Sequence, residues 1–174
     1  MATGRSIQLT KQVGEYLVAA ELGRRGLIAS TFSGSVPDYD IIATDSSFRS
    51  VPVQVKASNG SSWQFDIRRF ADVQLVGKKQ VIGRRTKLPR EIIFVMVVLV
   101  KDGSDRFYVL SLKSLQRLLV DHHRAYLAKH GGVRPRKYDS FHAAITEADL
   151  LAFKDGWLAA FHDTAGLLIT DPGR

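Results

Sequence analysis

Four polar side chains interrupt apolar segments in the first third of the 174-residue chain. Two are carboxylates: Glu15 lies within a helical pattern, and Asp40 opens an apolar run. Gln54 and Lys56 follow, two residues apart in the next apolar run. Carboxylate and amide oxygens are ligands that Mg²⁺ accepts, and the carbonyl of Val55 is a further oxygen donor. Since a lysine can orient a water molecule or neutralise charge on a phosphate, this set suits metal-assisted hydrolysis of a phosphodiester.

The spacing within residues 48–58 places Gln54 and Lys56 on one side of a predicted strand. Alternate side chains of a strand point to opposite faces, so the other face consists of Val51, Val53 and Val55. We expect the valines in the core and the polar face in a polar environment, because burying an unpaired polar group costs about 2 kcal/mol or more. Asp40 opens the preceding predicted strand. Asp38, in the loop before that strand, is the alternative candidate for the same acidic role. The alternative is a solvent-facing Gln54 and Lys56 on a half-covered sheet.

Glu15 belongs to a helix predicted over residues 10–25, with Thr10 as its N-cap and Gly26 directly after its end. Two apolar stripes of this helix are expected to be covered: Val13, Leu17 and Ala20 on one, and Val18, Ala19 and Leu22 on the other. Because Glu15 adjoins the second stripe, its carboxylate should lie at the edge of the stripe or point into a polar pocket.

The segments VGEYLVAAELGRRG, PDYDIIA and VPVQVKAS resemble the PD-(D/E)XK nuclease superfamily. That family has an acid on its first core helix, an Asp at the start of a strand, and an acid-x-Lys pair on the next strand. The matching positions here are Glu15, Asp40, and Gln54 with Lys56. Gln54 stands where the family usually has Asp or Glu. This Q-x-K variant is similar to cyanobacterial group I intron homing endonucleases and, more distantly, to archaeal Holliday-junction resolvases, over residues 10–66.

The resemblance implies a restriction-endonuclease-like core and hydrolysis of DNA with Mg²⁺, which Mn²⁺ can replace. In that case Asp40, Gln54, Glu15 and the carbonyl of Val55 hold the metal, and Lys56 assists the attacking water. The carboxylate missing at Gln54 leaves a second hypothesis open: a DNA-binding or assembly module with weak or no catalysis. A third hypothesis is a nuclease that acts on RNA or on single strands.

The charge balance favours a polyanionic partner such as DNA. The chain has 25 Lys and Arg against 17 Asp and Glu, a formal net charge of +8, and phosphate contacts dominate nucleic-acid affinity. We expect a basic loop at residues 77–90 and a second basic stretch at 131–138. The predicted DNA contacts are Arg68, Arg69, Lys78, Lys79, Arg84, Arg85, Lys87, Arg90, Arg134, Arg136 and Lys137. The alternative is that both stretches are simply solvated.

The order of the remaining elements predicts an α/β or α+β fold built around one central mixed β-sheet flanked by helices. Further strands are expected at residues 27–32, 63–67, 92–100 and 106–112. Helices are expected at residues 111–130 and 146–162, the second with a capping box from Thr146 and Asp149. We expect a single nuclease-like domain over residues 1–174, with its motifs in 10–66 and a helical part in 111–165.

Several classes of protein are disfavoured by composition. The chain has no cysteine, so disulfide frameworks and thiolate metal sites are excluded. The apolar run 92–100 suits a buried strand rather than a membrane span, and the N-terminus lacks the apolar core of a signal peptide, so a cytoplasmic protein is expected. Adjacent His122 and His123 are expected on the surface of a helix. Cleavage of both DNA strands would favour a homodimer.

Overall fold

The computed structural model describes residues 4–32, 38–88 and 91–171. The chain divides into two compact units: unit 1 is Met1–Ser61, Glu91–Leu112 and Leu150–Arg174, and unit 2 is Ser62–Arg90 and Lys113–Asp149. The single-domain organisation stays a prediction. Within the described ranges, no helix has the length and apolar character needed to cross a membrane.

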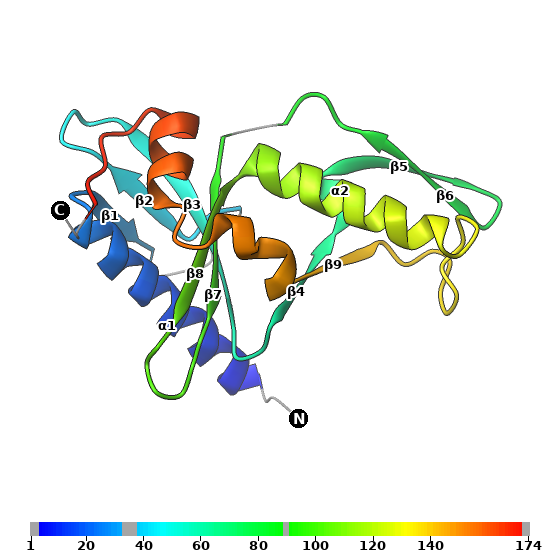
Figure 1. The fold of residues 1–174 in the computed structure, drawn as a ribbon, viewed down its shortest axis with the longest axis horizontal. Helices are drawn as coiled ribbons and strands as arrows, with labels where there is room; N and C mark the ends of the chain where they lie inside the picture. Colours follow the sequence, from blue (N-terminus) through cyan, green and yellow to red (C-terminus); the bar gives the residue numbers. More distant parts are fainter. Residues whose placement is uncertain (1–3, 33–37, 89–90, 172–174) are drawn as a thin grey trace. The chain divides into compact units, whose positions relative to one another are not determined.

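Unit 1 contains a five-stranded mixed sheet (Figure 1). Its strand order is β1-β2-β3-β7-β8, and only the β3–β7 pair is parallel. The strands are β1 (Ile28–Thr31), β2 (Ile41–Thr44), β3 (Ser50–Ser58), β7 (Ile93–Val98) and β8 (Arg106–Ser111). Every predicted strand of this sheet is therefore present, and the predicted mixed α and β architecture is confirmed.

The alternation predicted for β3 is confirmed by its burial. Its valines lie in the core of unit 1, whereas Gln54 and Lys56 are half-exposed. In β7 all six residues are buried, as expected for the most apolar run of the chain. The same core includes Trp157 and Phe161 from the C-terminal segment.

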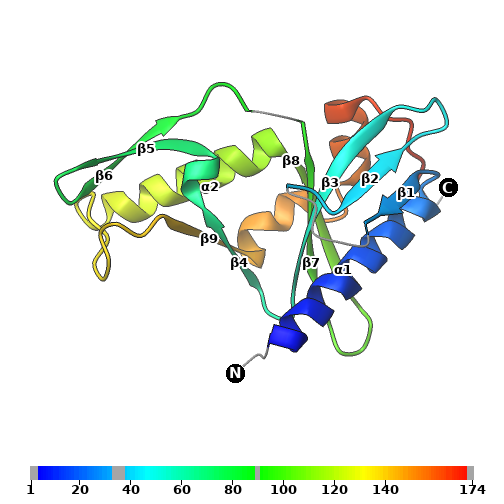
Figure 2. The ribbon, with the colours of Figure 1, turned by 180° about the vertical axis from the view of Figure 1, so that it is seen from behind.

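Helix α1 spans Gly4–Arg24 and packs along β3 and β1 (Figure 2). It begins six residues before the predicted start. Thr10 is therefore not the N-cap: it lies inside the helix, and its Oγ1 donates to the carbonyl of Ser6 at 2.9 Å. The helix ends as predicted, because Gly26 adopts φ +81° and the backbone N–H of Leu27 donates to the carbonyl of Leu22.

The buried stripe of α1 consists of Gly14, Val18 and Leu22. The prediction for Val18 and Leu22 is thus confirmed. The predicted stripe of Val13, Leu17 and Ala20 is wrong, since Val13 is 45% exposed and Ala20 is exposed as well. Apolar side chains surround much of this helix, so their pattern alone did not indicate that the glycine would face the sheet.

The C-terminal part is not the continuous helix predicted over residues 146–162. A 3₁₀ segment, η2 (Glu147–Phe153), and a π-helical segment, η3 (Ala159–Thr164), are separated by a turn. In that turn Lys154 forms a bridge to Tyr108, and Asp155 adopts φ +51° while its N–H donates to the carbonyl of Phe107. Pairing with β8 therefore competes successfully with helix continuation. The predicted capping box does form, as Thr146 donates to Asp149 through its backbone N–H and its hydroxyl.

Unit 2 contains two antiparallel strand pairs and helix α2 (Leu112–Ala128). The first residue of this helix, Leu112, is still counted in unit 1. β4 (Ser62–Asp66) pairs with β9 (His142–Thr146), and β5 (Ala71–Val76) pairs with β6 (Lys79–Arg84). A short 3₁₀ turn, η1 (Ile67–Arg69), follows β4. Two predictions fail here: residues 79–84 are a strand rather than part of a basic loop, and the helical part expected over 111–165 is interrupted by β9.

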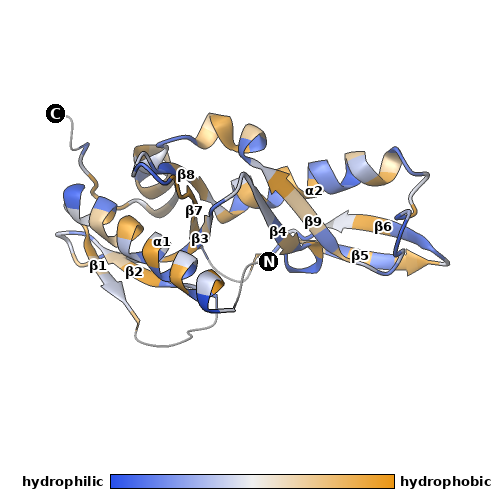
Figure 3. Cartoon of the chain, turned by 90° about the horizontal axis from the view of Figure 1, so that it is seen from below, coloured by the Kyte–Doolittle hydropathy of each residue, from blue (hydrophilic) through white to orange (hydrophobic). Residues whose placement is uncertain are grey.

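The strand expected at residues 63–67 corresponds to β4, and Trp63 and Phe65 in β4 and Ile67 in η1 are at most 6% exposed. Along α2 both hydrophobic and hydrophilic residues occur (Figure 3), and polar side chains connect this helix to the ribbon β5–β6. Gln116 Nε2 donates to the carbonyls of Phe70 and Arg85, and Arg124 donates to the carbonyl of Ile82.

His123 is a buried member of the same set of polar contacts. Its Nε2 lies 3.0 Å from Gln80 Oε1, and its side chain is 3% exposed. The prediction of a surface position for His123 is therefore wrong, whereas His122 is half-exposed.

Candidate active site

The candidate site lies where β3 extends beyond its neighbour β2. The pairing of the two strands ends at Ile41 and Val53. One residue earlier, the backbone N–H of Asp40 donates to the carbonyl of Val53 at 2.9 Å. The N–H of Val55, beyond the last pair, donates to Asp40 Oδ2 at 2.8 Å. A carboxylate thus replaces a strand carbonyl at this edge, which fixes the orientation of the Asp40 side chain.

Gly14 brings α1 unusually close to β3. A Cβ atom on Gly14 would lie 2.4 Å from the Cβ of Ala57, a distance that side chains do not adopt. The close approach places the next residue, Glu15, beside the end of β3. A second contact also joins the two elements, because Asn59 Nδ2 donates to Thr10 Oγ1 at 2.9 Å.

Lys11 connects the two carboxylates of the site. Its Nζ lies 3.2 Å from Asp40 Oδ1 and 3.4 Å from Glu15 Oε1. The side chains of Glu15 and Asp40 are 17% and 10% exposed, against 54% for Lys11. Lys11 is therefore exposed to solvent, whereas the two carboxylates that it contacts are largely buried.

The pKa values of Glu15 and Lys11 depart from their usual values. Burial raises the pKa of Glu15, and the negative charge of Asp40 raises it further, although Lys11 acts in the opposite direction. Burial lowers the pKa of Lys11, but the attraction and hydrogen bonds of Asp40 and Glu15 outweigh this effect, so its pKa lies above the usual value. Two adjacent carboxylates therefore favour a cation at this place.

A pocket of about 480 Å³ opens on this edge of the sheet. Four of the predicted site residues line it together: Asp40, Gln54, Val55 and Lys56. Glu15 is not among the lining residues and is connected to them through Lys11. Further lining residues come from α1, from the end of β3 and from the segment after it: Ser6, Ile7, Thr10, Lys11, Ala57, Ser58, Asn59 and Gly60.

The residues present fit a divalent cation. The fit rests on the position of the Lys11 ammonium, a cation that already contacts one oxygen of Asp40 and one of Glu15. Gln54 and Val55 add neutral oxygen donors to the same pocket. No three His, Asp or Glu side chains of residues 4–32, 38–88 and 91–171 form a metal cluster by themselves. A bound Mg²⁺ would therefore need neutral protein oxygens or water besides the two carboxylates.

The described members of the predicted DNA contacts before residue 91 lie in η1, in the ribbon β5–β6 and in the segment after β6. Arg68 pairs with Asp66, with its guanidinium 4.5 Å from the ring of Phe141, and Arg85 Nε lies 3.3 Å from Asp72 Oδ1. The exposed members are Arg68, Arg69, Lys78, Lys79 and Lys87. Arg84 is the last residue of β6, and Arg90 lies outside the described residues.

The later predicted contacts belong to the segment between α2 and β9. Arg136 and Lys137 are exposed, and both line a pocket of about 490 Å³ together with Arg134. Arg134 donates to the carbonyl of His142, and its guanidinium lies 5.2 Å from the ring centroid of Tyr126.

Comparison with solved structures gives an informative likeness. No protein-family model matches the chain, and no curated protein matches it in sequence. Among solved structures it is similar to a bacterial homing endonuclease, I-Ssp6803I, at 14% identity and a TM-score of 0.52. The likeness covers 92% of this chain and 97% of the other. The two chains share one fold. The predicted arrangement, a mixed sheet flanked by helices, is thus a nuclease-like fold.

Lys11 is the residue of the site that the sequence analysis missed. Its spacing of four residues from Glu15 on the helix was the available signal, since such pairs are neighbours on a helix surface. That spacing explains the contact with Glu15 only. The contact with Asp40 depends on the approach of α1 to β3, and no sequence pattern indicates it.

Proposed function

We propose that the protein is a Mg²⁺-dependent endonuclease of the PD-(D/E)XK type, which hydrolyses DNA phosphodiester bonds at the pocket beside β3. The observation that carries the proposal is that Asp40 and Glu15, from different elements, contact one cationic group at a pocket lined by Gln54 and Lys56. The fold shared with a homing endonuclease supports the same class of reaction.

The roles follow from the chemistry of each group. Asp40, Glu15, the amide oxygen of Gln54 and the carbonyl of Val55 would hold the metal, for which Mn²⁺ is the expected substitute. When bound, such an ion supplies electrostatic stabilisation of the phosphate and favours deprotonation of water. Lys56 orients the attacking water or neutralises charge that develops on the phosphate. The backbone of Val55 keeps Asp40 in place through its 2.8 Å hydrogen bond.

DNA binding is assigned to the basic residues of unit 2, and a homodimer would allow both strands to be cut. The exposed lysines of the ribbon and the basic segment after α2 are suited to phosphate contacts, which carry no sequence information themselves. We assign a cytoplasmic location to this activity.

Plasmid cleavage tests the proposal directly. Supercoiled DNA should be nicked or linearised with Mg²⁺ or Mn²⁺ and left intact with EDTA. Asp40→Ala and Lys56→Ala should each abolish cleavage while circular dichroism stays unchanged, and Lys101→Ala, an exposed lysine in a turn of unit 1, serves as the matched control. Full cleavage by Asp40→Ala would refute the metal role of this residue.

The second candidate function is a DNA-binding module without efficient catalysis. The observation in its favour is Gln54, which leaves the site with one carboxylate fewer than the acid-x-Lys pattern. DNA binding without cleavage under any metal would select this function. Cleavage of RNA or single strands in preference to duplex DNA would select the third hypothesis.

A further inference from the structure

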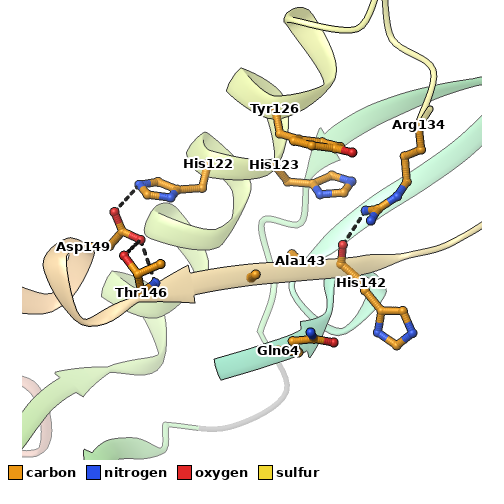
Figure 4. A pocket seen from close by; sticks show the side chains of 10 residues that line it. Gln64, His122, His123, Tyr126, Arg134, His142, Ala143, Thr146 and Asp149 are labelled. Atoms are coloured by element: carbon orange, nitrogen blue, oxygen red, sulfur yellow. Dashed lines mark hydrogen bonds and ion pairs between the residues drawn. The ribbon is translucent and has the colours of Figure 1, made fainter. Parts of the chain in front are cut away.

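A second pocket, of about 580 Å³, lies entirely within unit 2 (Figure 4). Eight of the ten lining residues have a side chain with a polar group, and the other two are alanines. The residues come from β4, α2, the segment after α2 and β9: Gln64, His122, His123, Tyr126, Arg134, His142, Ala143, Ala144, Thr146 and Asp149. None of them belongs to the candidate active site.

One end of the pocket is formed by an Asp–His pair. Asp149 Oδ2 accepts hydrogen bonds from the N–H and the hydroxyl of Thr146 at 2.7 and 2.8 Å, which fixes the carboxylate. Its Oδ1 lies 3.5 Å from Nε2 of His122. Asp149 is the only acid among the residues that line this pocket, and its charge is directed at an imidazole and two donors rather than into open space.

Arg134 forms the other end and is held in a fixed segment. Its guanidinium donates to the carbonyl of His142 and lies near the ring of Tyr126. The segment that carries it is fastened to β6 by Gln80, whose Nε2 donates to the carbonyls of Tyr138 and Ser140 and whose N–H donates to the carbonyl of Gly132.

Buried His123 supports this fastening. It contacts Gln80 Oε1 at 3.0 Å, and burial together with the charge of Arg134 lowers its pKa to about 4. His123 is therefore neutral near pH 7 and leaves the positive charge of this end to Arg134.

The chemistry of the lining selects a nucleotide. A guanidinium provides several N–H donors in a planar fork that matches phosphate oxygens. Tyr126, which is 38% exposed, offers an aromatic ring, and Gln64 offers amide groups to a polar ring system. The small side chain of Ala143 leaves the space between the two ends open (Figure 4). Single-stranded nucleic acids are bound by this combination of positive charge and aromatic surface.

We propose that this pocket binds one unstacked nucleotide of a DNA strand, with its phosphate at Arg134 and its base between Tyr126 and the His122–Asp149 end. The assignment of DNA as the ligand rests on the proposed function. Binding at this pocket does not need a metal or the carboxylates beside β3, so the two proposals fail separately.

The test uses the metal-free full chain with Asp40→Ala and calorimetric titration with three probes: deoxyadenosine monophosphate, inorganic phosphate and a short single-stranded oligonucleotide. We expect the oligonucleotide and the mononucleotide to bind in competition and more tightly than phosphate. Arg134→Ala should weaken both by roughly tenfold or more, because a charge-assisted contact is lost. Arg117→Ala, an exposed arginine of α2 outside the pocket, should bind normally.

Three outcomes would overturn the proposal. Equal affinities for phosphate and mononucleotide would show that the pocket binds only an anion and does not recognise the base. If the oligonucleotide does not displace the bound mononucleotide, a DNA strand is not the ligand of this pocket. Unchanged affinity in both Arg134→Ala and His122→Ala would place any binding elsewhere; the second variant serves if the first fails to fold. Cleavage or its absence in the unmodified chain affects none of these readings.

Discussion

Lys11 Nζ lies 3.2 Å from Asp40 Oδ1, whereas the other oxygen of the same carboxylate is bonded to the backbone of β3. The lysine thus contacts the oxygen that remains for a metal. A lysine ammonium and a divalent cation at one carboxylate oxygen repel each other, so binding of one disfavours the other. The side chain of Lys11 is 54% exposed, so it has room to move away from Asp40 when a metal binds.

We therefore predict that Lys11→Met strengthens Mg²⁺ binding by roughly five- to tenfold, because about 1 kcal/mol of charge repulsion is removed. Calorimetric titration of the DNA-free protein measures the affinity. Lys101→Met, in an exposed turn, is the control for the loss of one positive charge. Weaker Mg²⁺ binding in Lys11→Met than in that control would show that Lys11 organises the carboxylates rather than competing for them.

Gln54→Glu should also strengthen Mg²⁺ binding, on the order of tenfold, since it replaces a neutral oxygen donor in the pocket by a charged one. The same titration measures this effect. Gln64→Glu, an exposed glutamine of unit 2, controls for overall charge. If both glutamate variants bind alike, Gln54 is not a ligand.

Gly14→Ala should destabilise the protein by about 1–3 kcal/mol, because the added Cβ would overlap with Ala57. Urea unfolding gives the free energy. In Gly14→Ala combined with Ala57→Gly the clash is removed, so most of the loss should be recovered. Gly23→Ala, with open space around its Cβ position, should not destabilise the helix. A loss that Ala57→Gly leaves unchanged would exclude the close contact as its cause.

The free energy of unfolding should decrease as the pH falls from 6.5 to about 4, with His123 as a contributor. The pKa of His123 is lowered to about 4, from an ordinary 6.5, by burial and by Arg134. In this interval the unfolded chain binds the proton and the folded chain does not, so stability is present at the higher pH and lost at the lower one. The contribution is on the order of 2 kcal/mol once solvent screening is allowed for.

Urea unfolding at several pH values, compared with His123→Asn, isolates this contribution from that of the carboxylates. The asparagine keeps a polar group near Gln80 but does not titrate. Parallel pH profiles of the two proteins would show that His123 has no part in the effect.

Lys78→Ala with Lys79→Ala should weaken binding to every DNA sequence alike and flatten the slope of log affinity against log salt by about 1.8. Both lysines are exposed at the turn of the ribbon, whereas Arg85 already pairs with Asp72 and should contribute less. Fluorescence anisotropy over a range of salt concentrations measures the slope. An unchanged slope would indicate that the turn is only solvated.

The sequence by itself determined the alternation of β3, the position of Asp40 directly before the neighbouring strand β2, and the mixed sheet. These features follow from local rules: a period of two separates valines from Gln54 and Lys56, and apolar runs of strand length pair in a core. The capping box of Thr146 and Asp149 is equally local, which is why it forms even though the helix expected after it does not continue.

Tertiary structure decided the features that depend on residues far apart in the chain. Gly14 faces the sheet because only a residue without Cβ admits Ala57 at that distance, and this approach brings Lys11 to Asp40. His123 can be buried because its ring nitrogen has a hydrogen-bond partner, the side-chain oxygen of Gln80, which lies 43 residues away in the sequence. The strands β6 and β9 form because each finds an antiparallel partner, β5 and β4 respectively. Composition and periodicity describe neighbours along the chain, whereas these contacts arise only when distant segments pack together.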